Sequence, residues 1–172
     1  MKAIKIILGI ITILVVGFFI TGLVVKETVY ETEIVINKPV SEVFELIKDK
    51  SKIKEWVTDV KSVEVMKETP SITGSLYKMT VDNRGNEVTM TQKVLAHVPN
   101  EKITHFFDAE NMLKTDDYLF SEDENGSTII TKTSSCRSES YIMSCLFPYF
   151  KSTFQEIDQK YLNNLKQLAE KQ

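Results

Sequence analysis

Arginine is scarce in this sequence, with only Arg84 and Arg137 among 172 residues. All 24 acidic residues lie beyond position 26. Of the 21 basic residues, Lys2, Lys5 and Lys26 lie within the first 26 positions and the other 18 lie beyond them. Residues 27–172 therefore carry a net charge of −6. No basic stretch alternates with aromatic residues. The charge and the pattern therefore argue against nucleic acid as a partner.

Glycine and cysteine are also rare. Three of the six glycines fall within the first 25 residues, and no glycine-rich loop that could hold a phosphate is present. The absence of a Gly-x-Ser-x-Gly sequence excludes the nucleophile elbow of α/β-hydrolases. Cys136 and Cys145 are nine residues apart, a spacing that matches no zinc or redox motif. They either form a disulfide in an oxidising compartment or are two small buried side chains.

Histidine occurs only at His97 and His105. Two histidines without a neighbouring cysteine or acidic pattern make a poor metal site, and we expect both at the surface or at a strand edge. Asp116 and Asp117 are neighbours in an expected strand, so their carboxylates point to opposite faces and cannot act on one substrate. The sequence thus predicts no metal site, no cofactor and no defined catalytic residue.

One long apolar segment is present at the N-terminus. No charged residue occurs from Ile6 to Val25, and such a segment spans about 30 Å as a helix, the thickness of a bilayer's hydrocarbon core. It is longer than the roughly 7–15 apolar residues of a secretory signal, and no clear cleavage pattern follows it. We therefore predict a transmembrane anchor over residues 1–26 and one soluble domain over residues 27–172. A cleaved signal peptide is the alternative.

The charges that flank the anchor predict its orientation. Lys2 and Lys5 precede the apolar segment, whereas Lys26 alone follows it closely. By the positive-inside rule, the N-terminus is expected in the cytoplasm and the soluble domain outside the cell membrane. No cysteine lies near the end of the segment, so a lipid-modified N-terminal cysteine is excluded.

The remaining sequence has the pattern of an α+β protein. Thr28–Ile36 alternates polar and apolar residues and predicts a strand, and two short helices are expected to follow it. A period of two then recurs, broken by turn residues, and predicts an antiparallel sheet of six or seven strands. A long amphipathic helix ends the chain, with polar residues such as Asp158 off its apolar stripe. Pro148 lies either in its first turn or at a kink in a longer helix that begins near Ser140.

Five stretches of the soluble domain carry a family pattern: Ile34–Phe44, Lys54–Trp56, Val94–Ile103, Asn125–Thr128 and Leu162–Glu170. Together with the order of elements, they resemble the START-like, or SRPBCC, superfamily, which includes polyketide cyclase/dehydrase-like proteins. The resemblance implies a helix-grip fold, in which a curved antiparallel sheet wraps a long C-terminal helix and encloses an apolar cavity. It specifies the fold more closely than the function.

We expect this cavity to bind an apolar or amphipathic small molecule, with a lipid as one candidate, because small-molecule sites have mostly apolar walls and few polar groups. Plain core packing is the alternative for each wall residue. The predicted ligand-binding residues are Tyr77, Met79, Met90, Gln92, Tyr118, Phe120, Phe147, Phe150, Phe154 and Tyr161. A cyclase/dehydratase-type enzyme and a protein-interaction module of the cell envelope are the alternative functions. For an enzyme, the acid–base candidates would be Tyr77, Gln92, His105 and Tyr118.

Overall fold

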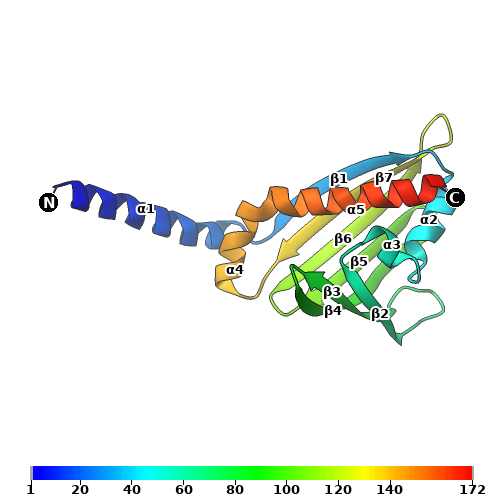
Figure 1. Ribbon diagram of the computed structural model, residues 1–172, viewed down its shortest axis with the longest axis horizontal. Coiled ribbons are helices and arrows are strands. Elements are labelled where there is room, and N and C mark those ends of the chain that lie inside the picture. Colours follow the sequence, from blue (N-terminus) through cyan, green and yellow to red (C-terminus); the bar gives the residue numbers. More distant parts are fainter. Residues whose placement is uncertain (1, 172) are drawn as a thin grey trace.

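The computed structural model describes residues 2–171 and shows one helix, α1 (Lys2–Val24), standing apart from an α+β domain (Figure 1). The strands of the domain are β1 (Thr28–Ile36), β2 (Val60–Lys67), β3 (Leu76–Asn83), β4 (Asn86–Val98), β5 (Lys102–Ala109), β6 (Met112–Glu122) and β7 (Thr128–Arg137). Its helices are α2 (Val40–Lys48), α3 (Ile53–Trp56), α4 (Tyr141–Leu146), the 3₁₀ helix η1 (Phe147–Phe150) and α5 (Lys151–Lys171).

All of these strands form one antiparallel sheet in the order β1-β7-β6-β5-β4-β3-β2. Strands β2 to β7 form a meander, whereas β1 pairs with β7 at the opposite edge from β2. The chain therefore crosses the sheet between β1 and β2, and α2 and α3 form this crossing. The long helix α5 packs against β1 and α3. This arrangement confirms the predicted helix-grip fold, with seven strands in the sheet.

The alternation of residues along β1 sets the two faces of the sheet. Every second residue of β1 is buried (Thr28, Tyr30, Thr32, Ile34 and Ile36), and the residues that alternate with them are exposed. This is the period of two expected for a strand with one covered face. The largest group of buried apolar side chains lies where α2 and α5 meet the sheet, and Phe44 and Leu165 are almost completely buried within it.

The C-terminal helical region is interrupted at Pro148. Helix α4 begins at Tyr141, η1 follows, and α5 continues from Lys151. Of the two predicted alternatives, the structure shows the longer region that begins near Ser140 and is broken at the proline, because proline lacks an N–H and disfavours a continuous α-helix. The break lets α4 turn away from α5 and contact α1 (Figure 1).

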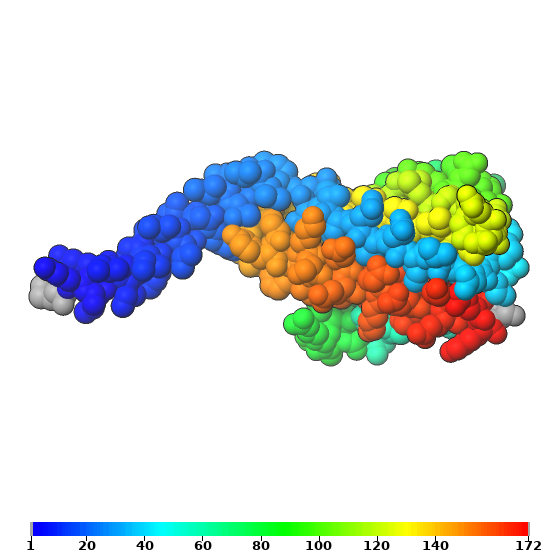
Figure 2. Space-filling model, turned by 90° about the horizontal axis from the view of Figure 1, so that it is seen from above, coloured from blue at the N-terminus to red at the C-terminus, as the bar shows by residue number. Residues whose placement is uncertain are grey.

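Helix α1 is long and apolar enough to cross a membrane, and almost all of its apolar side chains are exposed (Figure 2). Its C-terminal end packs against α4 and η1. The Phe19 ring stacks on the Tyr141 ring with 6.1 Å between their centroids. The hydroxyl oxygens of Thr21 and Tyr149 lie 2.9 Å apart. A specific contact therefore joins α1 to the C-terminal region of the domain.

Replacing Gly22 with leucine should separate α1 from α4. A Cβ atom at position 22 would collide with Cys145 Sγ and lie 3.3 Å from the Cys145 backbone nitrogen, so one helix must move. Overpacking of this kind costs about 1–3 kcal/mol, and we expect amide hydrogen exchange in α4 to become about tenfold faster. Gly17→Leu is the control, because a Cβ atom there meets nothing within 4 Å. Equal exchange rates in the two variants would show that the helices are not held together.

Candidate functional site

A cavity of about 640 Å³ lies between the sheet and the helices α3, α4 and α5. Its apolar wall includes Met79 and Met90 from the strands, Trp56 from α3, and Phe147 and Phe154 from the C-terminal region. Small-molecule sites typically have volumes of about 300–1,000 Å³ and mostly apolar walls. The cavity therefore has the size and the lining of a small-molecule site.

The structure places eight of the ten predicted ligand-binding residues on the wall of this cavity: Met79, Met90, Gln92, Tyr118, Phe147, Phe150, Phe154 and Tyr161. Tyr77 lines a neighbouring pocket instead. Phe120 lies in the apolar core, where its ring packs against Phe44 with 5.2 Å between centroids. Phe120 is therefore not among the residues that line the cavity. Contact between the other residues and a ligand stays a prediction.

Four charged side chains meet on one side of the cavity and form what we call the ion cluster: Lys114 and Asp116 from β6, Lys132 from β7 and Asp158 from α5. One carboxylate oxygen of Asp158 lies 2.9 Å from each of the two ammonium nitrogens. Asp116 lies 3.1 Å from the Lys114 nitrogen and 3.0 Å from the Lys132 nitrogen. Two positive and two negative charges balance, as the burial of ions requires.

Two hydroxyl groups complete the hydrogen bonding of the ion cluster. Tyr30 donates a hydrogen bond of 2.9 Å to Asp158. The Ser134 hydroxyl lies 2.7 Å from an oxygen of Asp116 and 2.9 Å from one of Asp158, and it donates its one proton to either. The polar groups of the cluster thus satisfy one another and hold this side of the cavity in a fixed arrangement.

Two members of the ion cluster, Asp158 and Lys114, keep their charges at neutral pH. Burial would raise the pKa of Asp158, but Lys132 and Lys114 outweigh this effect and hold that pKa well below its ordinary value. Burial would lower the pKa of Lys114, but Asp116 and Asp158 raise it well above its ordinary value. Asp158 and Lys114 therefore present fixed charges to the cavity.

His105 is buried, with 6% of its surface exposed, so the prediction of a surface or strand-edge position was wrong. Its ring faces the cavity and lies 6.0 Å from the Tyr118 ring, between centroids. Burial, with smaller contributions from Lys50 and Lys132, lowers the pKa of His105 well below its ordinary value. The imidazole is therefore neutral at pH 7. His97 is half-buried and lines the neighbouring pocket.

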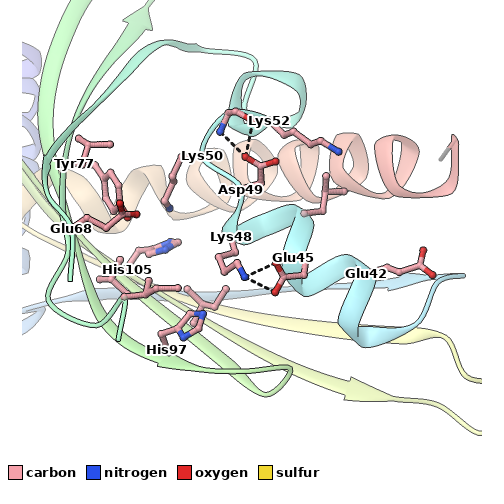
Figure 3. A pocket seen from close by; sticks show the side chains of 16 residues that line it. Glu42, Glu45, Lys48, Asp49, Lys50, Lys52, Glu68, Tyr77, His97 and His105 are labelled. Atoms are coloured by element: carbon pink, nitrogen blue, oxygen red, sulfur yellow. Dashed lines mark hydrogen bonds and ion pairs between the residues drawn. The ribbon is translucent and has the colours of Figure 1, made fainter. Parts of the chain in front are cut away.

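The neighbouring pocket, which we call the side pocket, measures about 590 Å³ and lies between the α2–α3 segment and strands β3 to β5 (Figure 3). Tyr77 lines the side pocket, whereas Lys50 and His105 line both hollows. The Lys50 ammonium nitrogen lies 5.1 Å from the centre of the Tyr77 ring. Burial lowers the pKa of Lys50 to about 8. Lys50 therefore marks the place where the cavity and the side pocket approach each other.

Two buried polar atoms on the cavity wall, Gln92 Oε1 and Trp56 Nε1, have no hydrogen-bond partner within residues 2–171. Gln92 is 1% exposed and Trp56 is 4% exposed. Buried polar groups are normally paired, because leaving one unpaired costs about 1–3 kcal/mol. One acceptor and one donor inside the cavity are therefore available to a ligand.

Both cysteines are free and buried. Cys136 lies on the cavity wall, and Cys145 contacts α1 at Gly22. Burial raises the pKa of the Cys136 thiol to about 11, so this group stays protonated at neutral pH. Of the two alternatives drawn from the sequence, the structure shows the small buried side chains.

The sequence pattern does not predict the ion cluster. Asp158 falls outside the apolar stripe of α5, yet it is 2% exposed. A signal is present in β7, where Lys132 and Ser134 occupy alternate positions between the buried residues Ile130 and Cys136. The period of two places both polar residues on the covered face of the sheet. A buried lysine implies a buried acid nearby, but the pattern does not show which one.

The sequence family described as polyketide cyclase/dehydrase and lipid transport matches residues 27–170. Protein TTHA0849 of Thermus thermophilus has a TM-score of 0.69 at 17% identity, over 82% of this chain and 96% of that one. The Zhui aromatase/cyclase of a Streptomyces species has a TM-score of 0.71 at 14% identity, over 84% of this chain and 94% of that one. The protein of unknown function SA2116 of Staphylococcus aureus has a TM-score of 0.63 at 17% identity, over 86% and 97%. At such identities these likenesses establish the fold alone, and no curated protein matches the chain.

Proposed function

The chain belongs to the polyketide cyclase/dehydrase and lipid transport family, and from this membership we propose that it is a membrane-tethered START-like domain that binds an apolar or amphipathic small molecule. The ligand occupies the cavity between the sheet and α5, and a lipid is the candidate that fits a tethered domain. The family and the aromatase/cyclase fold support a domain that binds a hydrophobic ligand or acts as a cyclase.

The observation that carries this proposal is that α4 takes part in both the cavity and the contact with α1. Met143 and Leu146 line the cavity. Tyr141 and Cys145 of the same short helix contact the end of α1. With α1 in a bilayer, the cavity lies beside the membrane surface, and a lipid-derived molecule reaches it over a short path. Tethering also raises the effective concentration of such a ligand.

Three features support a retained anchor over residues 1–26 in place of a cleaved signal. The apolar side chains of α1 are exposed on all sides, as lipid contact requires. Gly22 leaves room for Cys145, a fit that has no use in a segment that is removed. Tyr141 and Tyr149 are exposed beside the end of α1, where tyrosine is common at membrane interfaces. The charges of Lys2 and Lys5 favour an N-terminus in the cytoplasm and a domain outside the membrane.

A cyclase/dehydratase-type enzyme is the second candidate, because polar side chains converge inside the cavity. Such an enzyme needs at least two of them, and Gln92, Tyr118 and His105 all line the wall. Neutral His105 has a ring nitrogen that is able to accept a proton, and burial, Lys50 and Lys132 disfavour the positive charge that results. A protein-interaction module is less favoured, because it would need a filled interior and the domain contains a cavity.

Trp56 provides a direct test, because it is the only tryptophan in the chain and it lines the cavity. Trp56 belongs to α3, which lies toward the end of the domain away from α1 (Figure 1). In proteoliposomes of the full chain with brominated acyl chains, a lipid that enters the cavity should quench most of the Trp56 fluorescence. Liposomes without bromine are the control. Unchanged fluorescence with every brominated lipid and fatty acid would contradict the proposal.

A further inference from the structure

Lys50 is the one positive charge on the cavity wall that has no acidic partner among the residues the structure describes. Lys114 and Lys132, the other two lysines of the wall, are neutralised within the ion cluster. The Lys50 side chain extends from the end of α2 toward Tyr77 and His105 (Figure 3). The Tyr77 ring attracts the ammonium group but does not neutralise it. One half-buried positive charge on the cavity wall therefore has no counterion within residues 2–171.

The acidic residues of the side pocket do not supply the missing partner. Glu45 pairs with Lys48, and Asp49 accepts hydrogen bonds from the backbone and hydroxyl of Ser51. Glu42 pairs with Lys38, and Glu68 is exposed to solvent and hydrogen-bonds with the Tyr77 hydroxyl. Burial lowers the pKa of Lys50, and no carboxylate among residues 2–171 raises that pKa again. An anion that binds beside Lys50 would therefore meet a charge that the protein itself leaves uncompensated.

Further polar groups lie on the same wall. Gln92 is the direct neighbour of Tyr77 in the pairing of β3 with β4. The Gln92 side chain therefore lies on the same face of the sheet as the Tyr77 ring, which the Lys50 ammonium group contacts. Its Oε1 atom is an unpartnered acceptor, and Trp56 Nε1 is an unpartnered donor. A headgroup that carries both an anionic oxygen and a hydroxyl would satisfy these atoms, since the oxygen accepts and the hydroxyl donates.

We propose that the ligand is an amphiphile with an anionic headgroup, a carboxylate or a phosphate ester, and that this headgroup pairs with Lys50 while the hydrocarbon part lies along Met79, Met90 and Phe154. The inference rests on the proposed function of the cavity and names the chemical class of its ligand. A charge-assisted hydrogen bond is stronger than a neutral one, and more so where water is excluded. The ion cluster does not compete for the anion, because its own charges balance.

The test compares anionic and neutral probes of the same chain length on the full protein in phosphatidylcholine proteoliposomes. A dibromo fatty acid is compared with its methyl ester, and a brominated lysophosphatidic acid with the matching monoacylglycerol. Quenching of Trp56 reports binding of each probe. We expect the protein to prefer at least one anionic probe over its neutral counterpart by about tenfold or more, the size of one charge-assisted hydrogen bond. The pair with the larger ratio distinguishes a carboxylate from a phosphate headgroup.

Variants of Lys50 separate this inference from the proposed function. Lys50→Gln should remove the preference by weakening the binding of the anionic probes, whereas Lys50→Arg should retain it. Lys54→Gln is the matched control, because Lys54 is exposed and does not line the cavity. Equal binding of anionic and neutral probes to the natural chain, or a preference that survives in Lys50→Gln, overturns the inference and leaves cavity binding intact. A chain in which no probe quenches Trp56 overturns both.

Discussion

Replacing Asp158 with asparagine is expected to lower the free energy of unfolding by about 3–5 kcal/mol, the usual cost of removing one partner from a buried ion pair. Asparagine keeps the shape of the side chain but leaves Lys114 and Lys132 with only Asp116 as a counterion. Both ammonium groups are poorly hydrated, with exposed side-chain fractions of 15% and 3%. An uncompensated charge in such a place is costly because water cannot reach it. Urea unfolding of the full chain in detergent measures the change.

Glu156→Gln is the control for this experiment. Glu156 lies two residues earlier on α5, is exposed, and should change the unfolding free energy by no more than about 0.5 kcal/mol. Combining Asp158→Asn with Lys114→Gln restores the balance of charge and leaves the pair of Lys132 and Asp116 intact. The double variant should therefore lose less stability than the sum of the two single variants. Equal effects of Asp158→Asn and Glu156→Gln would mean that the cluster is hydrated and contributes little.

The fold could be predicted largely from local pattern, as β1 and α5 show. The alternation along Thr28–Ile36 fixes which side chains face inward, whatever the rest of the chain does. The apolar residues from Phe147 to Leu168 recur at helical spacing and likewise predict one covered face. The break at Pro148 is different, because a proline is compatible with either a helix start or a kink. The structure shows the kinked arrangement, in which α4 contacts α1.

The candidate site could be predicted only in part, and the reason is physical. Apolar wall residues such as Met79 and Phe154 follow from periodicity, since an inward position on a strand or helix is expected to be apolar. Lys132 and Asp158 break this expectation, and each would be unfavourable alone. They become tolerable because β6, β7 and α5 bring four charges together from distant parts of the chain. That convergence belongs to tertiary structure and has no local signature.

The prediction that His105 lies at the surface or at a strand edge was wrong for the same reason. The sequence shows that His105 follows the turn at Pro99–Asn100 by a few residues, but its neighbours in sequence do not show what covers it. In the structure, Tyr118 lies beside it on β6, and Lys50 approaches from the segment after α2. The side chain is thus removed from water by residues far from it in the chain. Its burial makes the stability of the protein depend on pH.

Lowering the pH from 7 to 5 is expected to reduce the unfolding free energy through His105, by up to about 2 kcal/mol. Burial holds the pKa of folded His105 well below the value of about 6.5 in an unfolded chain. Between these two values the unfolded chain binds a proton that the folded chain does not. Stability is therefore full above about pH 6.5 and falls below it, by up to about 1.4 kcal/mol per pH unit. Lys50 and Lys132 disfavour protonation further, as does His97 when it is charged.

His105→Phe should flatten this dependence, because phenylalanine fills the same place beside Tyr118 without a titrating group. Urea unfolding at pH 7, 6 and 5 measures the slope. The pKa of His97 is also lowered by burial, so His97→Phe is the matched comparison and should remove a smaller part of the slope. The pKa of Asp158 is lowered instead, so its contribution is lost only in more acidic solution, below about pH 4. A slope between pH 7 and 5 that survives in His105→Phe would show that the buried imidazole is not its source.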